Sequence, residues 1–268
     1  MKKILLALLA VAGFTANAQK LDNALLWKIT GKGLTQPSYL FGTIHITCDA
    51  TLDAKTKKAL DDTKQIYLEL DMDDPGMQAA MMGGIMMKDG VTMSSLVSAE
   101  DFKIVDEFLT KNVRMSAKMM DSFKPALISA MLYPKMIDCP MQSFEMELMK
   151  EAVAQNEEIL GLESVADQMN VFDAIPYKDQ MNELVKTAKG GINKDKKEFA
   201  KLMAVYQSKD IEGMHKLMDE SENKMYSKFE DVMLDNRNKK WIPVIEAAAK
   251  RHLLSLLSAR HTWPEITA

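Results

Sequence analysis

Four short segments rich in strand-forming residues are separated by long stretches with helical periodicity, which limits the architectures open to the chain. The first two segments flank a glycine-containing turn, so we expect them to pair as a hairpin. Strands interspersed with helices bury a sheet beneath helical layers. We therefore predict a helix-rich α/β fold, with a small central β-sheet wrapped by many α-helices. The predicted strands are 24–30, 38–45, 65–71 and 158–163.

The helical stretches carry local start and stop signals. Ser98 begins one helix with capping-box-like spacing, and Pro125 opens another. Further helices are predicted over 54–64 and 143–155. From 164 to 248 the pattern predicts four or five amphipathic helices. Breaks between them are expected near Pro176, Gly190-Gly191, Ser208 and Glu220.

The N-terminus has the layout of a cleavable secretory signal. Lys2 and Lys3 precede an apolar run over 4–14, and small residues follow up to Ala18. We expect a signal peptide over 1–18, cleavage near Ala18, and a periplasmic or secreted protein. The apolar run is too short to span a bilayer, and no cysteine follows the cleavage site, so no stable membrane anchor is expected.

The remainder, 19–250, contains no Pro/Gly/Ser-rich linker, low-complexity tract or internal repeat. We predict one domain, although this length would also accommodate two. With 27% charged and 47% hydrophobic residues, the chain can bury a sizeable core. A formal net charge of −4 without a basic cluster argues against nucleic acid or an anionic membrane as the main partner.

The chain has two cysteines, Cys48 and Cys139. In an oxidising compartment they are expected to form a disulfide that closes a long loop. The alternative is two buried free thiols. Two cysteines cannot build a thiolate metal site, and the absence of a C-x-x-C motif argues against thiol redox catalysis.

Acidic and imidazole side chains stand at the ends of the predicted strands. His45 ends the second strand, Glu69 and Asp71 end the third, and the fourth ends in Glu163. α/β folds usually assemble their sites at such strand ends. One histidine with two or three carboxylates can hold a divalent metal, or the groups can form a buried polar network without a ligand.

Four short motifs, taken together with their order along the chain, resemble the TraB/GumN family, which is related to the Tiki-type proteases. The resemblance runs over about 26–250, nearly all of the predicted mature chain. The two motif glycines would let the backbone turn tightly or come close to a neighbouring group. The matching residues are Gly42 with His45, Glu69, Gly161 with Leu162, Glu163 and Gln168, and Arg237 with Asn238.

The resemblance implies metal-dependent hydrolysis, with peptide-bond cleavage the activity attributed to the Tiki branch. His45 and Glu163 would then bind a divalent metal such as Mn²⁺, Co²⁺ or Zn²⁺. Glu69 would be a further ligand or the general base for a metal-bound water. Arg237 would stabilise oxyanion charge or orient a carboxylate. The alternative for Arg237 is a salt bridge that ties the last helix to the sheet.

The C-terminal segment, 251–268, departs from the family pattern, which carries a second Gly-x-x-His on a strand. One hypothesis is a frameshift, because a one-base offset can encode a strand-like segment ending in glycine. The other is a divergent end with a short helix over 252–258. Only His252 or His261 could then replace the missing ligand, so we expect weak or no activity.

Two further alternatives stay open. The methionine-rich segment over 72–93 could be an adaptable lid over a peptide groove, a thioether site for Cu(I), or packing filler on a helical hairpin. The whole protein could also be a non-catalytic haem- or peptide-binding protein of the cell envelope. For the enzyme hypothesis, the expected partner is a peptide or small-molecule substrate.

Overall fold

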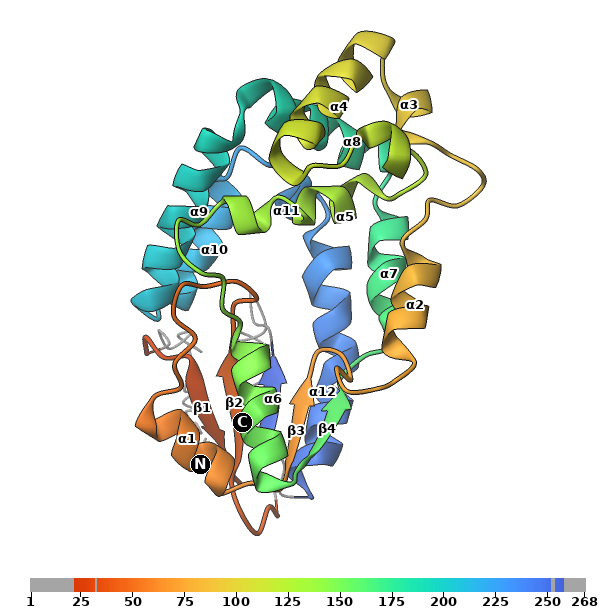
Figure 1. Cartoon of the computed structure of the whole chain (residues 1–268). Coiled ribbons are helices and arrows are strands. Elements are labelled where there is room, and N and C mark those ends of the chain that lie inside the picture. Colours follow the sequence, from red (N-terminus) through yellow and green to blue (C-terminus); the bar gives the residue numbers. More distant parts are fainter. Residues whose placement is uncertain (1–21, 32, 252–253, 258–268) are drawn as a thin grey trace, which may run out of the picture.

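The computed structural model describes residues 22–31, 33–251 and 254–257, whose strands form one five-stranded sheet in the order β1-β2-β5-β3-β4 (Figure 1). The predicted hairpin is confirmed, since β1 is antiparallel to β2. The other pairings are parallel. The predicted helix-rich α/β fold is confirmed. The strands are β1 (Leu26–Ile29), β2 (Ser38–Gly42), β3 (Gln65–Leu68), β4 (Glu158–Gly161) and β5 (Leu254–Leu257).

Helices make up most of the described chain. No helix in that part of the chain is long and apolar enough to cross a membrane. The α-helices are α1 (Ala54–Asp61), α2 (Met77–Gly84), α3 (Met93–Leu96), α4 (Ala99–Val113), α5 (Pro125–Ala130), α6 (Phe144–Gln155), α7 (Val165–Ala174), α8 (Tyr177–Gly190), α9 (Ile192–Gln207), α10 (Ile211–Glu220), α11 (Met225–Lys228) and α12 (Asn236–Ala249). Short 3-10 helices η1 (Ala117–Met120) and η2 (Tyr133–Lys135) and a π-helical turn η3 (Asp231–Asp235) complete the set.

The sequence signals for helix ends act as predicted. The Ser98 hydroxyl accepts a hydrogen bond from the backbone N–H of Asp101 at 3.1 Å and caps α4. Pro125 occupies the first turn of α5, where its missing N–H costs no hydrogen bond. Gly191 has φ of 75° and separates α8 from α9. Local chemistry therefore sets these boundaries.

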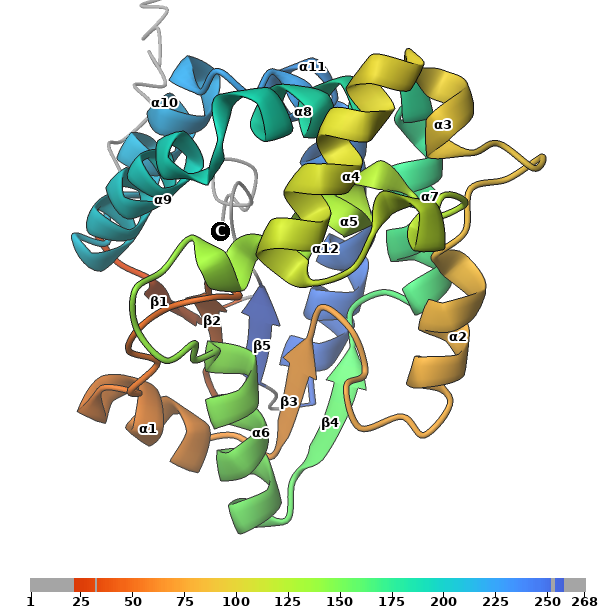
Figure 2. The same cartoon turned by 45° about the horizontal axis from the view of Figure 1, so that its top comes forward.

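The sheet is covered on both faces. Helices α1 and α6 lie on one face and α12 on the other (Figures 1 and 2). Their apolar side chains meet the strands in one core, which includes the buried residues Leu40, Ile66, Leu148, Ile159 and Trp241. Both faces of the sheet are therefore buried.

A second core lies among the helices beyond the carboxyl ends of the parallel strands (Figure 1). It joins α3, α4, η1, α5 and α8 through the buried side chains of Met93, Leu109, Met120, Ile128 and Leu184. The carboxyl edge of the sheet therefore lies between two packed regions. Side chains at this edge of the sheet can therefore contact residues of both packed regions.

The C-terminal segment contributes a central strand rather than the predicted helix over 252–258. Leu254–Leu257 forms β5, which pairs in parallel with both β2 and β3. Without β5, the facing edges of β2 and β3 would carry unpaired backbone N–H and C=O groups. β5 forms hydrogen bonds with both edges. The helix prediction is wrong for these four residues. The predicted signal peptide and 258–268 lie outside the described residues.

Before Met93 the methionine-rich segment contains one helix, α2, so it is not the helical hairpin of the packing alternative. Met87 and Met93 are nevertheless buried in the second core, as packing residues would be.

After α2, Met86 forms an isolated antiparallel bridge with Phe123, and a turn with positive φ follows at Asp89 and Gly90. Gly84 allows α2 to approach α7 closely, because a Cβ there would lie 2.3 Å from Cγ of Met169. The segment therefore passes from the edge of the sheet to the helical core.

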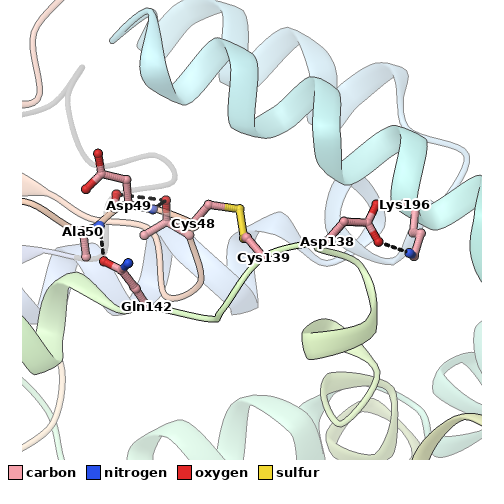
Figure 3. Close-up of a disulfide and its surroundings, with 8 residues drawn as sticks. Cys48, Asp49, Ala50, Asp138, Cys139, Gln142 and Lys196 are labelled. Atoms are coloured by element: carbon pink, nitrogen blue, oxygen red, sulfur yellow. Dashed lines mark hydrogen bonds and ion pairs between the residues drawn. A yellow bond between two sulfur atoms is a disulfide. The ribbon is translucent and has the colours of Figure 1, made fainter.

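The predicted disulfide is present, linking Cys48 to Cys139 with a Cα–Cα distance of 5.7 Å (Figure 3). Beside it, the backbones of Thr47 and Gln142 exchange two hydrogen bonds of 3.0 and 2.9 Å. The Gln142 side chain also accepts the backbone N–H of Ala50. The loop after β2 is thus held against the segment that precedes α6.

Gly161 ends β4 where two backbones approach closely. A Cβ at this position would lie 2.7 Å from the backbone nitrogen of Asp71 and 2.9 Å from the carbonyl oxygen of Glu163. Both neighbours are backbone atoms and cannot rotate away. The motif glycine therefore serves the contact between the ends of β3 and β4.

Replacing Gly161 with alanine should lower the free energy of unfolding by about 1–3 kcal/mol, because the added methyl group overpacks two backbone segments. Urea denaturation would measure the loss. Gly83→Ala is the matched control, since its Cβ would meet nothing within 4 Å in α2 and alanine favours a helix. Equal effects in the two variants would contradict this role for Gly161.

Cys139→Ser should lower the free energy of unfolding by about 2–4 kcal/mol, because the disulfide restrains a long loop in the unfolded chain. The cysteines are 91 residues apart in sequence. Guanidinium denaturation with and without reductant would measure this loss in the free energy of unfolding. Wild-type protein should match the variant under reducing conditions, and insensitivity of the wild type to reductant would oppose the prediction.

Candidate active site

Three parallel strands deliver the predicted polar residues to one edge of the sheet. His45 follows β2, Glu69 follows β3 and Glu163 follows β4. The strands run in the same direction, so their carboxyl ends lie at the same edge (Figure 1). The backbone N–H of Glu163 donates to the carbonyl of Glu69 at 3.0 Å, which fixes the last two segments side by side.

Arg237, in the first turn of α12, binds both glutamates. Its Nη2 lies 2.7 Å from Oε2 of Glu69 and 2.5 Å from Oε1 of Glu163. Its Nε lies 3.2 and 3.1 Å from the two carboxylate oxygens of Glu163. Trp241, one turn later, donates from its indole to Oε2 of Glu163 at 3.2 Å and stacks beneath the guanidinium.

Burial makes this ion-pair network strong and costly to break. The exposed side-chain fractions are 16% for Arg237, 10% for Glu69 and 5% for Glu163. Burial opposes the charge on Arg237, but hydrogen bonding and attraction to the glutamates, Glu163 first, leave its pKa raised. The salt bridge predicted as one alternative for Arg237 is therefore present, and Arg237 also orients Glu69.

Gln168 provides a second fixed contact for Glu69. Its Nε2 donates to Oε2 of Glu69 at 3.0 Å. Gln168 lies in the first turn of α7, which starts at a capping box formed by Ser164 and Asp167. The helix start thereby sets the position of the amide that orients the carboxylate.

Glu145, in the first turn of α6, is a site residue that the sequence analysis did not identify. Its Oε1 lies 3.0 Å from Nδ1 of His45 and accepts the Thr43 hydroxyl at 2.9 Å. Its Oε2 accepts the Ser143 hydroxyl at 2.5 Å. The disulfide and the adjacent backbone bridge bring the His45 loop and α6 together.

Glu145 is ionised throughout the physiological pH range. Burial alone would raise its pKa, but the hydrogen bond and attraction from His45, with the Ser143 hydroxyl, lower the pKa to about 2. An ionised Glu145 can only accept hydrogen bonds, so Nδ1 of His45 carries the proton in this pair. His45 itself is 59% exposed.

A cavity of about 250 Å³ brings these groups together. His45, Glu145 and Glu69 all contribute to its wall, whereas Glu163 and Arg237 do not. The lining residues are Thr43, His45, Leu68, Glu69, Leu70, Met72, Met77, Ser143, Glu145 and Gln168. The predicted site residues thus form two groups. One lines the cavity, and the other is the buried arginine clamp, in which Arg237 binds Glu69 and Glu163.

Asp71 was predicted beside Glu69, and it does not itself line the cavity, although its neighbours Leu70 and Met72 do. Burial first, then hydrogen bonding and repulsion from Asp73, raises its pKa to about 6.

Gly42 forms backbone hydrogen bonds on both sides, to Leu25 at 2.7 Å and from the Tyr206 hydroxyl at 2.9 Å. It anchors the loop that carries His45.

A sequence profile of the TraB/PrgY/gumN family matches residues 25–263. The chain belongs to the TraB/PrgY/gumN family. This finding confirms the resemblance seen in the order of the four motifs. The match includes the strand ends, the arginine clamp and the described strand β5, so the geometry above belongs to a TraB/PrgY/gumN protein.

One curated relative of this TraB/PrgY/gumN protein is metalloprotease TIKI2 from Xenopus tropicalis. The two are 30% identical over 84 residues, which is 30% of this chain and 16% of the relative. The match therefore spans less than a fifth of the relative's own length. No solved structure matches this chain significantly.

The side chains of this TraB/PrgY/gumN protein, as arranged, do not fit a metal ion. Among the described residues, no three His, Cys, Asp or Glu side chains are grouped so as to hold one. Both oxygens of Glu163 accept hydrogen bonds from Arg237, and Oε2 of Glu69 accepts from Arg237 and Gln168. In this arrangement the carboxylates of Glu69 and Glu163 are bound to the guanidinium of Arg237.

Glu145→Gln should lower the free energy of unfolding at pH 7 by at most about 3 kcal/mol. This is the free energy that corresponds to lowering the pKa of Glu145 from 4.5 to about 2 on folding. Because the folded pKa is depressed, this stability is present above the unfolded pKa and is lost as pH falls from about 5 towards 2. The difference in free energy of unfolding between wild type and variant should therefore be smaller at pH 3.5 than at pH 7. Denaturant titrations at both pH values measure it.

Glu147→Gln provides the control for that experiment. Glu147 lies in the same helical turn and pairs with Lys150 near the surface. Its replacement should change stability by less than about 0.5 kcal/mol at either pH. A pH-independent deficit in Glu145→Gln would show that Glu145 contributes through packing alone.

Proposed function

We propose that this protein is an exported hydrolase that cleaves peptide bonds. The observation that carries the proposal is the shared cavity of His45, Glu69 and Glu145 at the carboxyl edge of the parallel strands. Such an edge is the usual location of α/β active sites. The partial similarity to a protein named as a metalloprotease supports the same reaction class.

His45 is the proposed general base. The ionised Glu145 holds the Nδ1 proton, so Nε2 is the nitrogen that exchanges a proton with a bound water. Water adds to the peptide carbonyl carbon as Nε2 takes its proton. The same proton then passes to the departing nitrogen, and cleavage yields one carboxylic acid and one amine.

Glu69 is proposed to bind and orient the water or the substrate N–H in the cavity. Arg237 and Gln168 fix its Oε2 in place. Arg237 is a positioning residue in this scheme, because it acts through Glu69 and does not line the cavity. Oxyanion stabilisation by Arg237, one of the predicted roles, would require it to leave the clamp.

A divalent metal stays a prediction of the family resemblance. A bound Mn²⁺, Co²⁺ or Zn²⁺ would act as a Lewis acid. The described side chains do not fit one, so no step above depends on it. Calorimetric titration with the three ions, comparing wild type with His45→Ala and Glu163→Ala, tests this prediction independently of activity.

Export is supported by the disulfide between Cys48 and Cys139 and by the signal-like N-terminal sequence. Structural disulfides persist in oxidising compartments and are rare in the cytosol. We therefore keep a periplasmic or secreted location as part of the proposal. Mass determination of the protein isolated from the producing cell would test cleavage near Ala18.

A non-catalytic peptide-binding protein is the second candidate. The observation favouring it is the clamp, in which Arg237 neutralises carboxylates that a hydrolase would use. Haem is the poorer ligand for this cavity, because about 250 Å³ lies below the usual range of sites for ligands of that size. Peptide binding without cleavage would favour this candidate.

Purified protein should hydrolyse a mixture of fluorogenic peptides, and His45→Ala should lower the rate at least about 100-fold by removing the general base. His215→Ala is the matched control, since His215 lies in α10 away from the cavity lining. Assays with and without Mn²⁺, Co²⁺ or Zn²⁺ cover the predicted metal. Absence of hydrolysis in every condition, or an unaffected His45→Ala, would refute the proposal.

A further inference from the structure

The cavity that holds the polar residues also has an apolar part. Leu68 and Leu70 line it from the end of β3, and both are buried. Met72 and Met77 line it as well, and both are only partly buried. A group that enters the cavity therefore meets imidazole and carboxylates together with two methionine side chains.

A tight turn before α2 sets the backbone position of Met77. Asp74 accepts the backbone N–H of Gly76 on its side chain at 2.7 Å and that of Met77 on its carbonyl at 3.0 Å. This turn sets the start of α2 next to the end of β3. The methionine side chains remain adaptable, because they are unbranched and have three rotatable bonds.

Helix α2 extends the apolar surface away from the cavity. None of its residues is buried and none is charged. Met81 is 38% exposed and Met82 is 61% exposed. Exposed apolar side chains gathered on one helix commonly mark a binding surface. Since α2 begins at Met77, in the cavity wall, this surface is continuous with the candidate active site.

We propose that Met72 and Met77 form a specificity subsite for an apolar side chain, such as leucine, methionine or phenylalanine, of a peptide substrate. The neighbouring peptide bond then lies beside His45 and Glu69. A cavity of about 250 Å³ suits a side chain with its adjoining backbone. The carboxylates of Glu69 and Glu145 disfavour an acidic side chain at the same place.

This inference rests on the proposed function, so binding is measured separately from cleavage. The probes are fluorescent peptides that are identical except for one central residue, leucine or glutamate, each with the carbonyl of the bond to be cleaved replaced by CH₂, which prevents hydrolysis and keeps the N–H. Wild-type protein should bind the leucine peptide at least about tenfold more tightly, in line with the discrimination that apolar pockets achieve. Fluorescence anisotropy measures both affinities.

Met77→Glu should reduce the preference for leucine at least about tenfold, because it places a carboxylate in the apolar lining. Met77→Leu should retain it, which separates loss of an apolar surface from loss of methionine itself. Met119→Glu is the matched control, since Met119 is 74% exposed on η1 and does not line the cavity. Thermal melting confirms that each variant is folded.

The outcomes separate this inference from the hydrolase proposal. Selective binding without cleavage of the unmodified peptides supports the subsite and refutes the hydrolase. Cleavage with equal affinity for the two probes, or a Met77→Glu variant that is folded and keeps the wild-type preference, refutes the subsite and leaves the hydrolase. Failure to bind either probe refutes the subsite as well.

Discussion

The guanidinium of Arg237 holds the ends of two strands and the first turn of the last described helix in one network. Glu69 and Glu163 are buried carboxylates on adjacent strands, and they would repel each other without the cation between them. Removing one member of such a network leaves a buried charge unpaired, which typically costs about 3–5 kcal/mol. This contact adds to the apolar packing of α12 against the sheet, and together with Gln168 it orients Glu69.

The opposite wall of the cavity depends on a covalent link. The disulfide between Cys48 and Cys139 lies beside the backbone bridge of Thr47 and Gln142, and together they bring His45 to Glu145. One side of the site is therefore held by buried charge and the other by a crosslink. Each device compensates for the short strands, whose ends alone would fix the loops weakly.

Much of the fold follows from local patterns, and the misses have physical causes. The first four strands were found because β-formers and turn residues bound them, and the disulfide because the chain has only two cysteines. Glu145 was missed because its partner, His45, lies 100 residues earlier in the sequence. The helical periodicity around Glu145 contains no information about a contact at that distance. The Leu-Leu-Ser-Leu-Leu run over 253–257 suits a helix as well as a strand, so β5 was decided by its neighbours in the sheet.

The position of β5 has a consequence for how the polypeptide reaches its final shape. Strands β2 and β3 lie on its two sides, yet both are synthesised long before it. Until β5 arrives, the β1-β2 hairpin and the β3-β4 pair are separate ribbons, each with an open edge that can template pairing with other chains. The pairing of β5 with both ribbons joins residues far apart in sequence, a contact pattern that slows folding.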